Sequence, residues 1–229
     1  RGARETFCRS QRLEVPLGEI ERNLESLRAA ERLARTAEDV HRLPWIIAYI
    51  ARDLGLLGHP DEALEVSGRA LALADAGADT NLRVLARSYA GQAHYALGNF
   101  SAAAKVMHDL LRDIGESDVQ ATYGLPFSGR TAFRCWWAWA LARRGASAEL
   151  VAVEAALLAE DVASDDPLSA TVAQYSAGFG ALGRDDCATA IERLEEALRR
   201  CQRWDFTAWF TNIASALGHA YARSGRVEE

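Results

Sequence analysis

The feature that most constrains this chain is a glycine that recurs about every forty residues. It stands in "LGLLGHPDEAL", "HYALGNFSAAA", "LARRGASAELV", "GALGRDDCATA" and "YARSGRVEE". The glycines are Gly58, Gly98, Gly145, Gly183 and Gly225, at spacings of 40, 47, 38 and 42 residues. Seven residues before each glycine stands a small residue: Ala51, Gly91, Ala138, Ser176 and Gly218. Such self-similarity is typical of proteins built from stacked repeats.

A helical hairpin explains both parts of this pattern. A first helix (A) ends at a glycine, which adopts positive φ without strain, and a second helix (B) runs back antiparallel to it. Two helices approach closely where one of them presents a small side chain. The sequence therefore predicts an all-α fold, a right-handed α-solenoid of about five hairpins of roughly 40 residues.

Apolar residues at i, i+3, i+4 and i+7 place the helices. We expect them at 18–37, 44–57, 60–76, 80–97, 100–114, 129–144, 147–162, 167–182, 185–201 and 206–224. Residues 114–129 form the longest break between them. The expected organisation is a flanking segment at 1–17 and a solenoid at 18–229, truncated within its last repeat. The chain starts without Met or an apolar leader, so we interpret it as a piece of a longer protein.

The six residues "GFGALG" match G-x-G-x-x-G, the pattern of loops that hold a dinucleotide. That fingerprint requires a strand before it and a parallel strand after it. The preceding "TVAQYSA" is typical of a helix, and Gly183 is in phase with the other turn glycines. We therefore interpret Gly183 as a hairpin turn and expect no nucleotide site.

Composition argues against several kinds of partner. The net charge is −6, which disfavours nucleic acid and anionic membranes. The four cysteines form no CxxC motif and no cluster with zinc spacing, so we expect neither metal nor cofactor. No apolar run approaches the length of a transmembrane helix. A cytoplasmic location is the expectation from these features.

The stretch "GQAHYALGNFSAAAKVM" resembles a tetratricopeptide repeat (TPR), although the period is longer and the usual first-helix Trp is mostly absent. Together with "YGLPFSGRTAFRCWWAWALARRG" and "WFTNIASALGHAYARSGRVEE", it resembles the C-terminal arrays of bacterial multidomain signalling ATPases. In that group a class III adenylate or guanylate cyclase domain often accompanies the array, and maltose-type activators carry a similar one. The chain itself contains no G-x-x-x-x-G-K-[ST] motif.

The resemblance implies that the A helices line a concave groove. Counted back from the turn glycines, the groove candidates are Arg52, Ser88, Gln92, Tyr95, Cys135, Trp139, Arg143, His219 and Arg223, with Trp45, Asn212 and Ser215 in the same phase. The fourth A helix contributes only Ala173, Ala177 and Gly180. Trp137 falls in the core register beside Ala138. The alternative is an inner face that is solvated, or filled by chain outside this sequence.

Stacking should bring Trp139 and Arg143 beside Gln92 and Tyr95. Indole and phenol rings offer flat apolar surface, and a guanidinium can fork onto a carboxylate or phosphate. We therefore expect an anionic or aromatic effector, or an acidic peptide, to bind there.

The expected function is a non-catalytic interaction or sensor module that binds a partner protein, peptide or small effector. One alternative is an oligomerisation scaffold, with self-association through an exposed end of the array. A helical enzyme is the other alternative. Among the groove candidates only His219 and Cys135 could act as base or nucleophile, and they lie far apart in the sequence.

Overall fold

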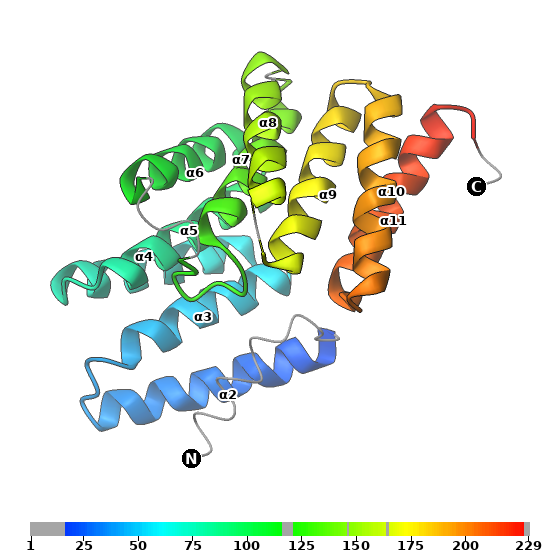
Figure 1. Ribbon diagram of the computed structural model, residues 1–229. Helices are drawn as coiled ribbons and strands as arrows, with labels where there is room; N and C mark the ends of the chain where they lie inside the picture. The colour runs from blue at the N-terminus through cyan, green and yellow to red at the C-terminus, as the bar shows by residue number, and fades with distance from the viewer. Residues whose placement is uncertain (1–16, 116–120, 146, 164, 227–229) are drawn as a thin grey trace. The chain divides into compact units, whose positions relative to one another are not determined.

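The structure is a computed structural model that describes residues 17–115, 121–145, 147–163 and 165–226 (Figure 1). These residues form ten helices and no strand. The helices are α2 (Leu17–Thr36), α3 (Leu43–Leu56), α4 (Pro60–Ala76), α5 (Thr80–Ala96), α6 (Phe100–Ile114), α7 (Gly129–Arg144), α8 (Ser147–Ala163), α9 (Pro167–Gly183), α10 (Cys187–Arg203) and α11 (Thr207–Arg223). The all-α prediction is confirmed, and most helix ends lie within a residue of the expected positions. Residues 1–16 of the expected flanking segment lie outside the described part of the chain.

The chain divides into two compact units, each built from helical hairpins. Unit 1 comprises Arg1–Ile114 with Thr122–Pro126, and unit 2 comprises Gly115–Ala121 with Phe127–Glu229. In unit 1, α3 pairs with α4 and α5 with α6, while α2 packs on α3. In unit 2, α7 pairs with α8 and α9 with α10, while α11 packs on α10. The A helices also contact one another, α3 with α5, α7 with α9, and α9 with α11.

Within two hairpins, the helices meet at a glycine of helix A. A Cβ built on Gly91 of α5 would lie 2.5 Å from Met107 Cε of α6, and one built on Gly178 of α9 would lie 2.7 Å from Leu194 Cγ of α10. The small residues reflect this packing, because a side chain at either position would displace a buried side chain of helix B.

The structure corrects the position of the fourth turn. Helix α9 continues through Gly183, and Asp185 is the residue with positive φ, at 66°. Asp tolerates this conformation better than most residues, so glycine is not required. The other four turn glycines have positive φ: Gly58 (81°), Gly98 (76°), Gly145 (69°) and Gly225 (80°).

The revised turn makes the repeat more regular. With Asp185 as the turn, its spacings to Gly145 and Gly225 both become 40 residues. The residue seven positions before the turn becomes Gly178, the one that contacts Leu194, in place of Ser176. The expected helix at 185–201 shifts by the same two residues, to Cys187–Arg203.

The G-x-G-x-x-G match lies inside helix α9. Gly180 is close-packed like Gly178, since a Cβ there would lie 2.0 Å from Oε1 of Glu154 on α8. Gly183, the last residue of the helix, would place a Cβ 3.0 Å from the Cβ of Ala142 on α7. The spacing of these glycines therefore follows from three separate helix contacts.

Part of the long connection packs onto unit 1. The Tyr49 hydroxyl donates a hydrogen bond of 3.0 Å to the Gly124 carbonyl. Gly124 has φ of +83°, and a Cβ there would lie 2.9 Å from Trp45 Cζ3 and 3.3 Å from Leu85 Cδ2. Residues Thr122–Pro126 thus lie against α3 and α5, where a larger residue than glycine would not fit.

The helix contact at Gly178 can be tested with a matched glycine. Gly178→Ala should destabilise the protein by about 1–3 kcal/mol, because the methyl group overlaps Leu194. Gly68→Ala in α4 should instead stabilise it by up to about 1 kcal/mol, because nothing lies within 4 Å of its Cβ position. Urea unfolding followed by circular dichroism measures both. Equal and small effects of the two substitutions would contradict the close contact.

Candidate functional site

The revised turn changes which residues of α9 occupy the positions of the groove candidates on the other A helices. Counted back from Asp185, the positions that match Cys135 and Trp139 of α7 are Tyr175 and Phe179. The three small residues expected there, Ala173, Ala177 and Gly180, are instead buried within unit 2. At the position six residues before the turn, both α7 and α9 therefore carry an aromatic residue, Trp139 and Phe179 respectively.

These residues belong to a connected aromatic cluster in unit 2. We define the aromatic cluster as Phe127, Trp136, Trp139, Tyr175, Phe179 and Trp209. Trp139 is central: its ring centroid lies 4.7 Å from that of Trp136, 5.7 Å from Tyr175 and 6.4 Å from Phe179. Most of the pairs meet edge to face, the arrangement that aromatic quadrupoles favour. Helices α7, α9 and α11 each contribute to it.

The cluster lies where the core of unit 2 reaches the surface. Tyr175 belongs to the buried core, whereas Trp139, Phe179 and Trp209 are partly buried and pack against that core. Their inner edges are therefore fixed by the close-packed helices, while part of each ring stays accessible. Rings held in this way lose little conformational entropy when they bind a ligand.

Arg143 adds a positive charge to the same face. Its side chain is exposed near the end of α7, and its guanidinium carbon lies 5.6 Å from the centroid of the Phe179 ring. This separation is within the range of a cation–π contact. The contact holds the guanidinium over the aromatic cluster, where it can meet a carboxylate or phosphate.

Two indole N–H groups of the cluster have no acceptor among the described residues. Nε1 of Trp139 and Nε1 of Trp209 are both shielded from solvent, and neither donates a hydrogen bond within the described part of the chain. Leaving a buried donor without an acceptor costs about 1–3 kcal/mol. An acceptor brought in by a ligand, reached by a turn of the indole, would remove that cost.

Two of the expected groove residues are buried, and assigning them to an accessible face was wrong. Ser88 is 0% exposed, and its hydroxyl donates to the Leu85 carbonyl at 2.8 Å. Cys135 is 1% exposed, and burial raises the pKa of its thiol to about 12. The matching Tyr175 is buried as well. At the position ten residues before the turn, the side chains of α5, α7 and α9 are therefore buried in the packing between helices.

Two expected groove arginines are engaged in contacts within their own units. Arg52 pairs with buried Asp53 at 2.8 Å and lies 5.2 Å from the centroid of the Tyr49 ring. Arg223 of α11 forms an ion pair with Asp185 and donates to the Leu182 carbonyl at 3.1 Å. These two contacts stabilise the turn after α9.

The remaining candidates differ in accessibility. Gln92 and Tyr95 of α5 are half-buried, with Tyr95 packed edge to face on Phe100 at 5.3 Å, and His219 of α11 is exposed. Gln92 and Tyr95 belong to unit 1 while Trp139 belongs to unit 2, so their expected juxtaposition stays a prediction. Trp137 is half-buried, which corrects its expected place in the core.

Part of the A-helix face of unit 1, at Trp45 and Tyr49, is covered by the chain itself. Trp45 lies against the loop at Gly124, and its Nε1 donates to the Asp79 carboxylate at 3.1 Å. The segment that covers this part of unit 1 belongs to the chain itself, whereas the alternative interpretation expected chain outside this sequence. The aromatic cluster of unit 2 is therefore the stronger candidate site.

Buried carboxylates of α8 form ion pairs with arginines elsewhere in unit 2. Glu154 of α8 pairs with Arg184, and burial raises the pKa of the Glu154 carboxyl group. Asp161, also on α8, accepts hydrogen bonds from Gln174 of α9, at 2.6 Å, and from Arg200 of α10. Because each carboxylate has a cationic partner, the network ties α8, α9 and α10 together. These pairs join residues far apart in the sequence and were not predicted from it.

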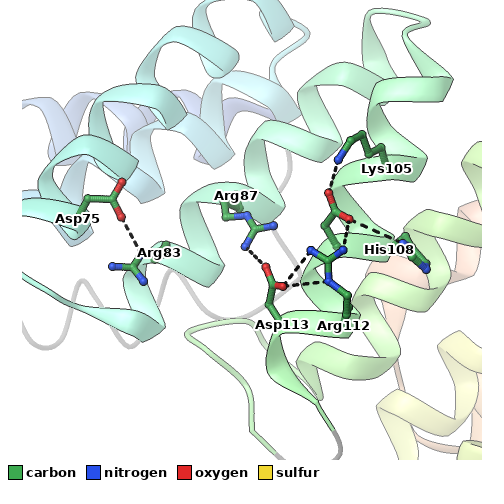
Figure 2. Close-up of polar contacts among 8 residues, drawn as sticks. Asp75, Arg83, Arg87, Lys105, His108, Arg112 and Asp113 are labelled. Carbon is green, nitrogen blue, oxygen red and sulfur yellow. Dashed lines mark hydrogen bonds and ion pairs between the residues drawn. The ribbon is translucent and has the colours of Figure 1, made fainter.

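Unit 1 carries a network of mostly exposed ion pairs (Figure 2). Arg87 of α5 bonds to Asp113 of α6 at 2.7 Å, and Arg83 bonds to Asp75 of α4 at the same distance. The hydrogen bond from Arg87 lowers the pKa of the Asp113 carboxyl group. Since each of these arginines faces a carboxylate, the network is not a concentrated basic surface of the kind that binds nucleic acid.

Two absences within the described residues bear on the kind of site. No group of three or more His, Cys, Asp or Glu side chains there is placed to hold a metal ion. None of the described helices has the length and apolar character needed to cross a bilayer.

Comparison with known proteins identifies the fold. Neither the protein-family models nor the curated proteins include a match to the chain. Among solved structures, BtubC (BKLC) from P. vanneervenii is similar with a TM-score of 0.62 and 16% identity, over 94% of this chain and 85% of that one. A Rap protein complexed with Competence and Sporulation Factor has a TM-score of 0.61 and 13% identity, over 92% of this chain and 61% of that one. The chain thus has a TPR-like helical-repeat fold.

The burial of Cys135 gives a chemical test of the site. A thiol with a pKa of about 12 holds almost no thiolate at pH 8, so it should not react with iodoacetamide in the folded protein. Half-exposed Cys187 serves as the internal control and should be alkylated first. Peptide mapping by mass spectrometry, before and after unfolding in urea, measures both. Rapid native alkylation of Cys135 would show that it is accessible and contradict the packing of α7 on α9.

Proposed function

We propose that the chain is a non-catalytic interaction module that binds an acidic segment of a partner protein, or an anionic effector, on the aromatic cluster of unit 2. The observation that carries this proposal is the exposed guanidinium of Arg143, held over Phe179 beside the half-buried indole of Trp139. Rigid aromatic rings next to an arginine are the residue types that dominate binding energy at protein interfaces.

The chemistry of the face favours a ligand with both an acceptor group and a flat or apolar part. A carboxylate or phosphate would accept from the Arg143 guanidinium, and an aromatic or aliphatic group would pack on the accessible edges of Trp139 and Phe179. The two indole donors without acceptors add further hydrogen-bonding capacity. The complex of the similarly folded Rap protein with Competence and Sporulation Factor supports a binding role.

The module would belong to a larger signalling protein. This part of the proposal rests on the resemblance to the helical arrays of bacterial signalling ATPases and cyclase-linked proteins. In a stack of repeats each hairpin contacts only its neighbours, so a ligand that bridges α7 and α9 would stiffen that step of the array. Such a change in stiffness would communicate ligand binding to a linked catalytic domain.

An enzymatic role has less support. Cys135, the one nucleophile among the groove candidates, is buried with a thiol pKa of about 12. The buried acids Glu154 and Asp161 are paired with arginines within the helix packing. Neither the Cys135 thiol nor the two carboxyl groups are accessible and activated, as nucleophilic or acid–base catalysis requires.

The proposal is tested by screening acidic peptides that contain an aromatic residue, with the tryptophan fluorescence of the cluster as the readout. Arg143→Ala should weaken binding of a peptide found in this way by about 1–3 kcal/mol, because the guanidinium contact is lost. Arg144→Ala is the matched control: it is exposed on the next residue of α7 and points about 100° away around the helix.

Loss of affinity in the Arg143 variant alone would support the site. Equal affinities of the wild type and both variants would place binding elsewhere, and failure of every acidic peptide and anionic metabolite to bind would refute the proposal.

A further inference from the structure

One connection of the chain is longer than the repeat requires. The turn residues Gly58 and Gly98 are 40 residues apart, and so are Gly145 and Asp185, and Asp185 and Gly225. Gly98 and Gly145 are 47 residues apart, and the excess of seven falls in the connection between α6 and α7. A stack of equal hairpins does not need these residues, so they are available for a role other than joining two helices.

The middle of this connection packs as a bound peptide would. We call Thr122–Pro126 the inserted segment. It clusters with unit 1, whereas the residues on either side of it, Gly115–Ala121 and Phe127–Glu229, belong to unit 2. Leu125 of the inserted segment is 7% exposed, and the carbonyl of its Gly124 accepts the hydrogen bond from Tyr49. The inserted segment therefore lies against α3 and α5 over the length of a short peptide.

The fit at Gly124 is specific for glycine. Its φ of +83° lies in the left-handed region, which disfavours any residue with a Cβ. A Cβ there would also lie 2.9 Å from Trp45 Cζ3, 3.1 Å from the Tyr49 hydroxyl oxygen and 3.3 Å from Leu85 Cδ2. Backbone conformation and space thus make the same demand independently, so the face discriminates between glycine and every larger residue.

The face that receives the inserted segment is held in shape by other contacts. The Trp45 indole donates to the carboxylate of Asp79, which also caps α5 by accepting from the Leu82 amide at 3.0 Å. The Tyr49 ring lies 5.2 Å from the guanidinium carbon of Arg52. None of these contacts involves the inserted segment, so both rings stay oriented without it. A site that is already formed binds its ligand at a lower entropic cost.

The inserted segment itself carries backbone strain. Tyr123 has φ of +51°, a conformation that is unfavourable for a residue with a Cβ. Its neighbour Thr122 is exposed, as is Pro126 at the other end of the segment. Release from the face relieves the strain at Tyr123, which brings the docked and released states closer in free energy. A competing ligand therefore needs only modest affinity to displace the segment.

We propose that the face of α3 and α5 around Trp45, Tyr49 and Leu85 binds a glycine-containing turn of a partner protein, and that the inserted segment is its built-in competitor. The partner's turn is uncharged, places a glycine of positive φ before an apolar residue, and offers the glycine carbonyl to Tyr49. Because the inserted segment is tethered, its effective concentration at the face is on the order of millimolar, and a partner binds only by displacing it. This second site lies in unit 1 and goes beyond the function proposed for the aromatic cluster.

The test uses the full chain and an unlabelled hexapeptide with blocked ends, Ala-Thr-Tyr-Gly-Leu-Pro, which reproduces residues 121–126. In Gly124→Ala the chain's own segment no longer fits, so isothermal titration calorimetry should give a hexapeptide Kd at least about tenfold lower than that of the wild type. Gly98→Ala is the matched control, because Gly98 has φ of +76° but nothing lies within 4 Å of its Cβ position. It should bind the hexapeptide as the wild type does.

A second hexapeptide, with alanine in place of glycine, should bind neither the wild type nor the variants. A measurement on the wild type decides the case in which Gly124→Ala fails to fold. The Leu125 amide donates to the Thr122 carbonyl at 2.8 Å within the docked segment. The glycine hexapeptide at about 1 mM should displace that segment and accelerate hydrogen exchange of the Leu125 amide, followed by NMR, by about tenfold. The alanine hexapeptide should leave the exchange rate unchanged.

Three results would overturn the proposal: a folded Gly124→Ala variant that binds the hexapeptide no better than the wild type, equal binding of the two hexapeptides, or Leu125 exchange that the glycine hexapeptide does not change. The acidic peptides proposed for the aromatic cluster contact α7 and α9, so an excess of the hexapeptide should not displace them. Failure of this site and failure of the aromatic cluster as a binding site are therefore distinguishable.

Discussion

The fold depends on the close contact between the two helices of a hairpin, at a small residue seven positions before a turn of positive φ. Gly91 receives Met107 there, and Gly178 receives Leu194, both of which are fully buried. A larger side chain at the glycine would push helix B outward and expose the apolar residues on both helices. Because each helix packs on the next, this contact sets the phase of the A and B helices along each unit.

That phase decides which side chains reach the accessible face. In unit 2 it places Trp139 and Phe179 at matching positions of α7 and α9, with the guanidinium of Arg143 over Phe179. In unit 1 the positions that match Trp139 are Arg52 and Gln92, and Trp45, two helical turns before Arg52, is covered by the segment that contains Gly124. The same type of hairpin therefore presents a partly covered face in unit 1 and an aromatic, cationic face in unit 2.

Sequence reasoning predicted the helices closely because their ends carry local signals. Pro60 and Pro167 begin α4 and α9, and Ser128 caps α7 with its side chain. The turn at Asp185 was missed because Asp can take the conformation usually given to glycine, while a true glycine stands two residues earlier. Because of that two-residue error, Ala173 and Ala177 were expected at the site in place of Tyr175 and Phe179. Contacts between residues far apart in the sequence, such as Tyr49 with Gly124, follow no periodic pattern, so they could not be predicted in this way.

The position of the turn after α9, which sets the phase of the helices in unit 2, is tested most directly by the free energy of unfolding of Asp185→Gly in an Arg223→Ala background. The background removes the ion pair between Arg223 and Asp185, so that backbone conformation alone is compared. A residue with φ of 66° should be stabilised by glycine, and we predict a gain of about 1 kcal/mol. If Gly183 were the turn, residue 185 would lie in the first turn of the next helix, and the substitution would lower stability by about 0.5–1 kcal/mol instead.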